Sequence, residues 1–427
     1  MKRGELLRQL SNGQLRDQLT PVYGRDAAAA TARLQELVLE FGQTFSCTDD
    51  TETYLFSTPG RTELGGNHTD HQHGRCLAAS VDLDTIACVV PNNSNIIRIK
   101  SRHHRMAEVD ISDLSRRPEE VDSSVSLVRG IAAKITQMGH TVGGFDAYTT
   151  TRVLRGSGLS SSAAFEVLVG TIMNHLFCDG ALSSTQIAQI GQYAENVYYG
   201  KPCGLLDQLA CATGGIVSID FANPDMPDIR QVQVDLHRQG YALCIVDSHA
   251  SHSDLTADYA AIPYEMKQVA ALLEKEVLGD VPYEQFRKNI SRIRTACGDR
   301  PVSRALHFYQ DNDRALAQYD ALKDGDFQRF LDLVIQSGRS SWMYLQNVST
   351  YRDSAAQPVA LILALAEELL AGRGAFRVHG GGFAGTVQAF VPLDLLDEFV
   401  ASINQIIGDG SCHVLNIRAA GSTVLVS

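Results

Sequence analysis

The sequence predicts an α+β fold (mixed α/β) in which strands and helices alternate along a chain of 427 residues. Strand-like segments rich in β-branched residues are followed by longer apolar segments typical of helices. The composition, 44% hydrophobic with 35 glycines and few aromatic residues, provides enough apolar side chains for a sizeable core. A chain of this length also favours two or three domains.

The first half of the chain begins with a helical region, in which residues 27–40 predict an amphipathic helix. Residues 84–90 and 95–100 are expected to form the two strands of one hairpin. Residues 183–199 predict a helix capped by one of the serines at its start. A polar, proline-containing stretch at 223–231 is a candidate boundary between domains.

The second half begins with an expected strand at 242–247 and ends with strands around a glycine-rich segment. Between them the chain is mainly helical in pattern. The remaining expected helices cover 258–278, 302–311, 324–338, 352–371 and 393–407, and the expected strands cover 375–378, 386–391, 412–417 and 423–426.

The charge balance and the cysteines limit the partners and the compartment. The net charge of −12 argues against nucleic acid, because binding a phosphate backbone requires a basic face, but it permits a nucleotide. The nine cysteines contain no C-x-x-C pair, which favours reduced thiols and a cytoplasmic protein. Residues 1–10 lack the apolar region of a signal peptide. The most apolar run, 359–370, is short and contains two glutamates, so it predicts a core helix and no membrane contact.

A loop rich in glycine and serine predicts an anion site. Residues 145–153 are typical of a strand and 163–177 of a buried helix, and glycines and three consecutive serines lie between them. The first turn of a helix carries unpaired N–H groups and a partial positive charge, and glycines allow a ligand close to the backbone. These features favour phosphate binding, with a serine-capped helix after a glycine turn as the alternative. The residues that would contact phosphate are Arg155, Gly156, Ser157, Gly158, Leu159, Ser160, Ser161 and Ser162.

Three further segments show what this loop resembles. Residues 59–71 surround polar and charged side chains with glycines, residues 203–208 contain Cys-Gly-Leu-Leu-Asp-Gln, and residues 377–386 are rich in glycine. Together with the loop, this ordered set resembles the signature motifs of the GHMP kinases. The segments at 59–71 and 203–208 resemble those of galactokinases in particular.

The resemblance implies an enzyme that phosphorylates galactose at its anomeric hydroxyl, with ATP and Mg²⁺. It also implies the two-domain GHMP kinase fold, with a ribosomal-protein-S5-domain-2-like N-terminal domain and a ferredoxin-like C-terminal domain. On this basis the chain divides into an N-terminal helical extension (1–46), an N-terminal domain (47–235) and a C-terminal domain (236–427). The expected partners are a small-molecule sugar and ATP. The oligomeric state is open, with a monomer favoured.

The resemblance assigns the chemistry to Asp207 and Arg61. Asp207 would accept the proton of the hydroxyl, and Arg61 would keep this carboxylate ionised and stabilise negative charge. From the residues alone, Asp207 is also suited to a helix N-cap, and Arg61 to a surface ion pair. Ser162 and Glu195 would hold Mg²⁺ through hard oxygen atoms, with a solvated helix face as the alternative for Glu195.

The resemblance also places the sugar beside the segment at 59–71. His68 and Asp70 would form hydrogen bonds with sugar hydroxyls. A zinc site is the alternative for the histidines and the aspartate of this segment, although their spacing is tighter than in structural zinc sites. The substrate-binding residues implied are Asn67, His68, Asp70, Gly204 and Tyr259, and for Tyr259 the alternative is simple packing.

The sequence departs from the galactokinase pattern on the sugar side. Asn67 stands where a glutamate near the O6 end of the sugar is usual, and Glu63 stands where an asparagine is usual. Because Asn67 carries no charge, a uronic acid such as galacturonate is an alternative substrate. A sensor that binds sugar and ATP without turnover is a further alternative, which the presence of all four catalytic and metal-binding residues disfavours.

Overall fold

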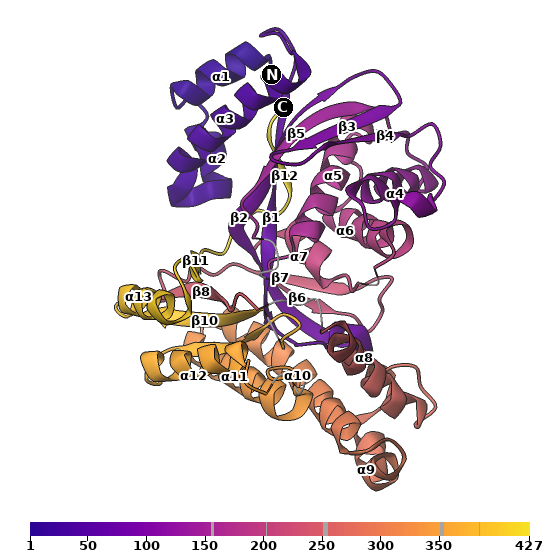
Figure 1. Ribbon diagram of the computed structural model, residues 1–427, viewed down its shortest axis with the longest axis vertical. Helices are drawn as coiled ribbons and strands as arrows, with labels where there is room; N and C mark the ends of the chain where they lie inside the picture. Colours follow the sequence, from indigo (N-terminus) through magenta and orange to yellow (C-terminus); the bar gives the residue numbers. More distant parts are fainter. Residues whose placement is uncertain (155–157, 202, 251–254, 351–353, 384) are drawn as a thin grey trace.

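The computed structural model describes residues 1–427 apart from 155–157, 202, 251–254, 351–353 and 384. Two sheets organise the described chain, one of eight strands and one of four. Figure 1 shows the larger sheet in the upper part of the molecule, between two groups of helices, and the smaller sheet below it with the C-terminal helices. The mixed α/β class predicted from the sequence is confirmed.

The larger sheet is built around two long antiparallel strands, β1 (Tyr54–Gly65) and β2 (Arg75–Pro91). Its order is β12-β1-β2-β5-β3-β4, with β6 also paired to β2 and β7 paired to β6. All but the first residue of β1 are buried, because helices cover both faces of the sheet. The other strands are β3 (Ile96–Ser101), β4 (Met106–Asp110), β5 (Phe145–Thr151), β6 (Ile216–Asp220), β7 (Asp228–Val232) and β12 (Thr423–Val426).

The hairpin expected from residues 84–90 and 95–100 is not formed. β5 lies between β2 and β3, and β3 pairs with β5 in parallel. The prediction is wrong because β5 is buried at six of its seven positions and therefore occupies the interior of the sheet, whereas the mostly exposed or half-buried β4 forms the edge beside β3.

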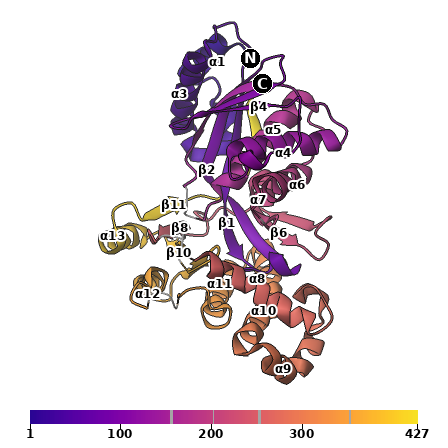
Figure 2. The same ribbon diagram turned by 45° about the vertical axis from the view of Figure 1, so that its right-hand side comes forward.

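Helices α1 (Arg3–Ser11), α2 (Arg16–Tyr23) and α3 (Ala27–Phe45) cover one face of the larger sheet, as Figures 1 and 2 show. Their apolar side chains form one cluster with residues of β1, β2 and β12. Helix α3 confirms the amphipathic helix predicted over 27–40 and extends five residues beyond it. The short 3₁₀ turn η1 (Gly24–Asp26) joins α2 to α3.

A buried carboxylate connects these helices to the sheet and to the C-terminal segment. Asp84 of β2 accepts a hydrogen bond from Tyr23 Oη at 2.9 Å and another from Ser57. Its carboxylate also contacts the guanidinium groups of Arg33 on α3 and of Arg418, the latter at 3.3 Å. One buried charge on β2 therefore binds side chains of α2, of α3 and of the C-terminal segment.

Four helices cover the opposite face and carry the predicted motifs. α5 follows β5 through the glycine-serine loop, as the sequence predicts. α6 begins with a capping box of Ser183 and Gln186, and then continues into the π-helical turn η4 (Ala194–Tyr199). The helices are α4 (Ser124–Gln137), α5 (Ser161–Phe177), α6 (Ser184–Tyr193) and α7 (Leu206–Thr213), and the turn η3 (Pro118–Glu120) precedes α4.

The smaller sheet is antiparallel, with the order β11-β8-β10-β9. The final strand, β12, does not join this sheet but pairs with β1 of the larger one. The sequence did not predict α9. The elements are β8 (Tyr241–Asp247), β9 (Ala375–His379), β10 (Thr386–Pro392), β11 (Cys412–Leu415), α8 (Thr256–Ala271), α9 (Tyr283–Cys297), α10 (Asp299–Lys323), α11 (Phe327–Ser340), α12 (Pro358–Leu370) and α13 (Leu396–Ile407), with the short turns η5 (Leu278–Asp280) and η6 (Ser341–Leu345).

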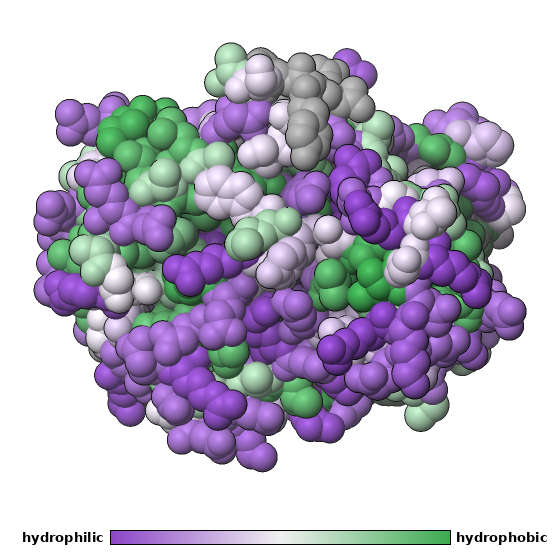
Figure 3. All heavy atoms as spheres, turned by 90° about the horizontal axis from the view of Figure 1, so that it is seen from below, coloured by the Kyte–Doolittle hydropathy of each residue, from purple (hydrophilic) through white to green (hydrophobic). Residues whose placement is uncertain are grey.

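Within the described chain, no helix has both the length and the apolar character needed to cross a membrane. The end of the molecule seen in Figure 3 carries apolar patches that polar side chains separate from one another. Scattered patches of this kind are ordinary on protein surfaces.

Candidate active site

A cavity of about 240 Å³ lies where the larger sheet meets the turn after β9. Its walls come from β1, from the loop and 3₁₀ turn η2 (Asp70–Gln72) that follow it, from the start of α7 and from the third glycine-rich segment. Segments far apart in the sequence therefore converge on one small volume. The lining residues are Arg61, Glu63, His68, Asp70, His71, Cys203, Gly204, Leu206, Asp207, Gly380 and Gly381.

Arg61 on β1 and Asp207 in the first turn of α7 meet at the wall of this cavity. Arg61 Nε donates to Asp207 Oδ1 at 2.7 Å, and Arg61 Nη2 lies 2.7 Å from the same oxygen. Burial raises the pKa of Asp207, but the charge and hydrogen bond of Arg61 and the hydroxyl of Ser160 outweigh it and hold the pKa below its ordinary value. Asp207 is therefore an ionised carboxylate that can accept a hydrogen bond from a hydroxyl.

The glycine-serine loop is attached to this pair. Leu159 O accepts a hydrogen bond from the backbone N–H of Arg61 at 3.1 Å, and Gly158 O accepts one from the guanidinium group. Ser160 has a φ of 57° and donates its hydroxyl to Asp207, so it does not cap the helix. Of the other predicted ATP contacts, Ser161 and Ser162 form the first turn of α5, and Arg155, Gly156 and Ser157 lie outside the described residues.

His379, at the end of β9, connects the third glycine-rich segment to β1 and to the loop. Its Nε2 accepts from the backbone N–H of Glu63 at 3.2 Å, so Nδ1 carries the proton and donates to Thr386 Oγ1 at 2.8 Å. Burial holds the pKa of His379 well below its ordinary value, and the ring is neutral. A Cβ at Gly158 would lie 3.0 Å from this ring. The two glycine-rich segments are therefore packed against each other.

His68 and Asp70 line the cavity from the loop after β1. His68 Nε2 lies 3.3 Å from Gly381 O, which only accepts, so Nε2 carries the proton. Burial lowers the pKa of His68 to about 3, which keeps the ring neutral. Gly204 approaches Asp70 so closely that a Cβ atom there would collide with the carboxylate. A neutral donor, a carboxylate and bare backbone are groups that suit sugar hydroxyls.

Asn67 and Tyr259 are not among the described residues that line the cavity. Asn67 is fully buried, and its Nδ2 donates to Glu63 Oε1 at 2.9 Å and to Gly380 O at 2.7 Å. The hydroxyl of Tyr259 donates to Gly382 O at 2.7 Å. Both residues therefore lie behind the cavity wall, where they hold groups that form it.

The carboxyl group that the cavity presents near Asn67 is that of Glu63. Its side chain is 11% exposed and accepts from Asn67 Nδ2 and from Arg377 Nη2, each at 2.9 Å. Burial raises the pKa of Glu63 to about 7, against the lowering effect of Arg377, Arg61 and Asn67. A titratable acid is thus present at the cavity, although the sequence alone indicated a loss of charge at Asn67.

Glu195, predicted to hold a metal, is buried in η4. Its oxygens lie 3.2 Å from Lys201 Nζ and 3.1 Å from Gln208 Nε2. Gln208 Nε2 also donates to Glu166 Oε2 at 2.9 Å, so one amide joins two carboxylates. Glu166 Oε1 is buried and has no hydrogen-bond partner among the described residues. Ser162 is exposed in the first turn of α5, and such oxygen donors fit a hard cation such as Mg²⁺.

The zinc alternative for the loop after β1 finds no support in this geometry. In the part of the chain that the structure describes, no three His, Cys, Asp or Glu side chains are placed to share a metal ion. His68 is committed to a backbone carbonyl, and the His71 Nε2 to Asp70 Oδ1 distance is 3.8 Å. The loop is therefore arranged to line a cavity.

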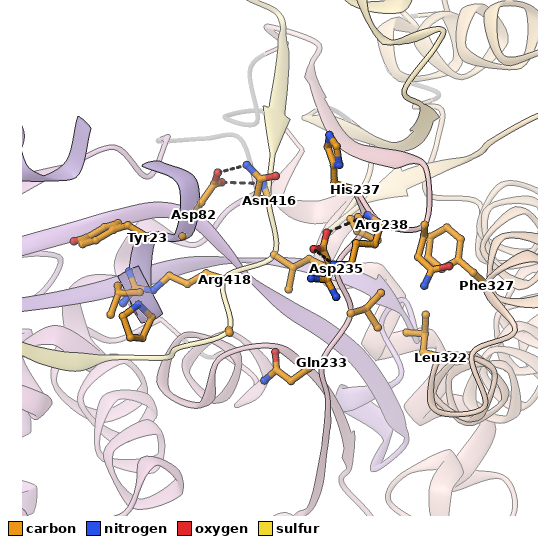
Figure 4. A pocket seen from close by; sticks show the side chains of 18 of the residues that line it. Tyr23, Asp82, Gln233, Asp235, His237, Arg238, Leu322, Phe327, Asn416 and Arg418 are labelled. Carbon is orange, nitrogen blue, oxygen red and sulfur yellow. Dashed lines mark hydrogen bonds and ion pairs between the residues drawn. The ribbon is translucent and has the colours of Figure 1, made fainter. Parts of the chain in front are cut away.

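A larger cavity, of about 810 Å³, lies elsewhere and shares no lining residue with the first. It is bounded by the end of α2, the segment before β8, the turn after α10 and the segment before β12 (Figure 4). Some of its polar groups contact one another: Asp82 accepts from Asn416 Nδ2 at 2.8 Å, and Arg418 lies over the ring of Tyr23. The chemistry of the lining, and not the volume, distinguishes the smaller cavity as the candidate site.

Comparisons with known proteins agree with this geometry. Residues 126–215 match the model of the GHMP kinases N terminal domain, and residues 39–91 match the galactokinase galactose-binding signature. The chain is 30% identical over 354 residues to a galactokinase of Streptomyces coelicolor, which covers 82% of this chain and 87% of that relative. The chain belongs to the galactokinase family.

Solved structures place this galactokinase-family chain in the same fold. A Lactococcus lactis galactokinase in complex with galactose matches with a TM-score of 0.78 and 25% identity, over 91% of this chain and 99% of that one. A mevalonate kinase of Methanococcus jannaschii matches with a TM-score of 0.60 and 13% identity, over 86% and 98% of the two chains. The second match shows a shared fold.

Sequence reasoning left three residues of this galactokinase-family site without a role. Glu63 is a departure from the galactokinase pattern, and the motifs assign nothing to Glu166 or Gln208. Glu166 could have been found, because it is the one acidic residue in the apolar helix predicted over 163–177. A carboxylate inside such a run requires a buried polar partner, and Gln208 supplies it.

Proposed function

We propose that this protein transfers the γ-phosphoryl group of ATP to the anomeric hydroxyl of galactose and forms galactose 1-phosphate. The observation that carries the proposal is the Arg61–Asp207 pair, which lies at the cavity wall and is attached to the loop before α5. This pair connects the part of the site suited to a sugar with the part suited to phosphates. The names of the Streptomyces coelicolor and Lactococcus lactis relatives support the choice of sugar.

Asp207 is the proposed base. Its carboxylate is ionised before substrate arrives, and it can accept the proton of the anomeric hydroxyl as the oxygen attacks phosphorus. Arg61 remains charged at all relevant pH values and would stabilise the negative charge that develops on the transferring group. Ser160 orients the second carboxylate oxygen through its hydroxyl.

His68, Asp70 and Gly204 are the proposed contacts for the remaining sugar hydroxyls. Asn67 and Tyr259 would act from behind the wall, Asn67 by holding Glu63 and Tyr259 by holding the third glycine-rich segment. Because buried polar groups left unpaired are costly, a site of this kind discriminates against sugars that lack a matching hydroxyl.

ATP would lie along residues 158–162, with its phosphates at the N-terminus of α5. Ser162 and Glu195 would hold Mg²⁺, which offsets the charge of the phosphates when it is bound. Glu195 lies 3.2 Å from the Lys201 ammonium, and a carboxylate that pairs with one cation is suited to another. We also propose a cytoplasmic location, because all nine cysteines are free thiols and such thiols persist in reducing compartments.

Release of ADP by the purified protein tests the proposed function. With galactose and ATP, we expect ADP and galactose 1-phosphate to form in equal amounts. A panel of other hexoses and galacturonate is measured beside it, and galacturonate is expected to be slower because Glu63 already brings a carboxyl group to the cavity. Binding of galactose and ATP without ADP release would identify a sensor, and turnover of galacturonate alone would contradict the proposed sugar.

The substitution Gly204→Ala is expected to raise the KM for galactose. The added Cβ would collide with Asp70 Oδ2 and displace this carboxylate, and misplacement of a substrate-positioning group by about 1 Å costs about 100-fold. Initial rates at varied galactose and saturating ATP measure the change, and the KM for ATP serves as the internal control. An unchanged KM for galactose would show that Asp70 does not contact the sugar.

The substitution Glu195→Gln is expected to raise the half-saturating Mg²⁺ concentration. Even residues that only support a metal ligand are worth about tenfold or more in affinity, so removal of a direct ligand should cost at least this. Binding of Mn²⁺ in the presence of ADP provides a second readout that does not require turnover. Glu284→Gln, at an exposed position at the start of α9, is the matched control. Equal Mn²⁺ affinity in both variants would exclude Glu195 as a ligand.

A further inference from the structure

Glu63 is an acidic residue that lines the cavity, and the proposed chemistry assigns no role to it. It lies two residues after Arg61 on β1, and both side chains line the same cavity. Residues i and i+2 of a strand point to the same face, about 6–7 Å apart, so Glu63 faces a bound sugar at a different point from the Arg61–Asp207 pair.

The carboxyl group is held from behind by two buried side chains. Asn67 Nδ2 and Arg377 Nη2 both donate to Oε1, each at 2.9 Å. Arg377 and Asn67 are fully buried. Asn67 is itself fixed, because its Oδ1 accepts from Asn347 Nδ2 at 2.8 Å and its Nδ2 donates to Gly380 O at 2.7 Å. These contacts orient the carboxyl group, and they leave Oε2 for the cavity.

We propose that Glu63 is a specificity-determining residue whose Oε2 accepts a hydrogen bond from a sugar hydroxyl other than the one that is phosphorylated. This inference rests on the proposed function of the site. A carboxylate only accepts hydrogen bonds, and a bond from a neutral hydroxyl to an ionised acceptor is stronger than one between two neutral groups. Glu63 therefore selects sugars that present a hydroxyl at this point and disfavours those that lack it.

The surroundings of Glu63 indicate that its carboxylate needs a hydrogen-bond donor from the substrate. Burial raises its pKa to about 7, against the opposing effect of Arg377 and Arg61, so the protein around the carboxylate solvates it poorly. Asp70 adds to this rise. A sugar hydroxyl that donates to Oε2 replaces the missing solvation and favours the ionised form.

A cycle of single changes in protein and sugar tests the proposal. The values of kcat/KM are measured at pH 8, where Glu63 is ionised, for galactose and for 2-, 3-, 4- and 6-deoxygalactose, with the wild type and with Glu63→Gln. Glutamine retains an oxygen for Asn67 and Arg377 but presents an amide donor to the cavity. We expect Glu63→Gln to lower kcat/KM for galactose by about tenfold or more, and to have an effect below about twofold on the one analogue that lacks the partner hydroxyl.

An equal loss on all five sugars would overturn the role of Glu63, because the change would then act without a particular hydroxyl. Thermal unfolding shows whether the variant is folded, and calorimetric titration with galactose gives the same cycle without turnover. If the wild type neither binds nor phosphorylates galactose, the proposed function fails. If the wild type is active and the losses are uniform, the inference about Glu63 alone fails.

Discussion

Replacement of Asp207 by asparagine is expected to lower kcat by about 10²- to 10⁴-fold, the usual worth of a positioned base. Asparagine retains the shape of the side chain and an oxygen that can accept from Arg61 Nε. It cannot take a proton from the anomeric hydroxyl, and it removes the charge that Arg61 and Ser160 now stabilise. The expected loss is in kcat, because substrate contacts made by His68 and Asp70 remain.

The measurement is ADP release at saturating galactose and ATP, with thermal unfolding as the check on folding. Asp220→Asn is the matched control, since Asp220 also pairs with an arginine, Arg75, at 2.7 Å but lies outside the cavity. The control is expected to retain wild-type turnover within about twofold, because partly exposed ion pairs contribute little. A loose transition state would make the effect of Asp207→Asn smaller, and unchanged turnover would remove Asp207 from the role of base.

The features that the sequence predicted best are those set by neighbouring residues. The strand, loop and helix of β5 and α5 follow from a β-branched run, glycines and an apolar run. The cap of α6 follows from Ser183 and Gln186, which bond to each other's backbone three positions apart. Local hydrogen bonding decides such features, so no knowledge of the rest of the chain is required.

Features that depend on distant contacts could not be predicted in this way. The pairing of β3 with β5 and the return of β12 to β1 are decided by competition for buried edges of a sheet, which no local pattern records. The Arg61–Asp207 contact joins residues 146 apart in sequence, and only the resemblance to a family brought them together in advance.

The direction in which a polar side chain points could not be predicted from the sequence either. Asn67 and Glu63 are four residues apart in one glycine-rich segment, and the resemblance to galactokinases assigned the sugar contact to Asn67. In the structure the amide of Asn67 forms hydrogen bonds with buried partners, whereas Glu63 lines the cavity. Because the burial of Asn67 depends on η6, on Asn347 and on the third glycine-rich segment, tertiary packing decides which of the two lines the cavity.

The substitution Asp84→Asn is expected to have the largest effect on stability, a decrease of about 3–5 kcal/mol in the free energy of unfolding. Asp84 is fully buried and contacts Arg33 and Arg418, of which Arg418 is 1% exposed. Without the carboxylate, both guanidinium groups lose their counter-charge while Arg418 remains out of water. The contacts of Tyr23 and Ser57 that attach the N-terminal helices would weaken at the same time.

The pH dependence provides a second check with a defined sign. Burial raises the pKa of Asp84, but Arg33 and Arg418 outweigh it and hold the pKa below its ordinary value of 3.8. The unfolded chain therefore binds this proton more tightly than the folded one, so the stabilisation is complete above pH 3.8 and is lost as the pH falls through the folded pKa. The difference between wild type and Asp84→Asn should accordingly be constant near neutral pH and decrease in acid.

Denaturant unfolding of the wild type, Asp84→Asn and Asp50→Asn compares the loss of a buried carboxylate with the loss of an exposed one. Asp50 pairs with Lys2 at 2.9 Å, but the two side chains are 85% and 61% exposed. Water solvates either partner when the other is removed, so Asp50→Asn is expected to leave the free energy of unfolding almost unchanged. Equal losses for the two variants would mean that Arg418 finds another counter-charge or water in the absence of Asp84. The N-terminal helices would then be held by their apolar cluster and by other hydrogen bonds, such as that from Gln18 Nε2 to Leu425 O.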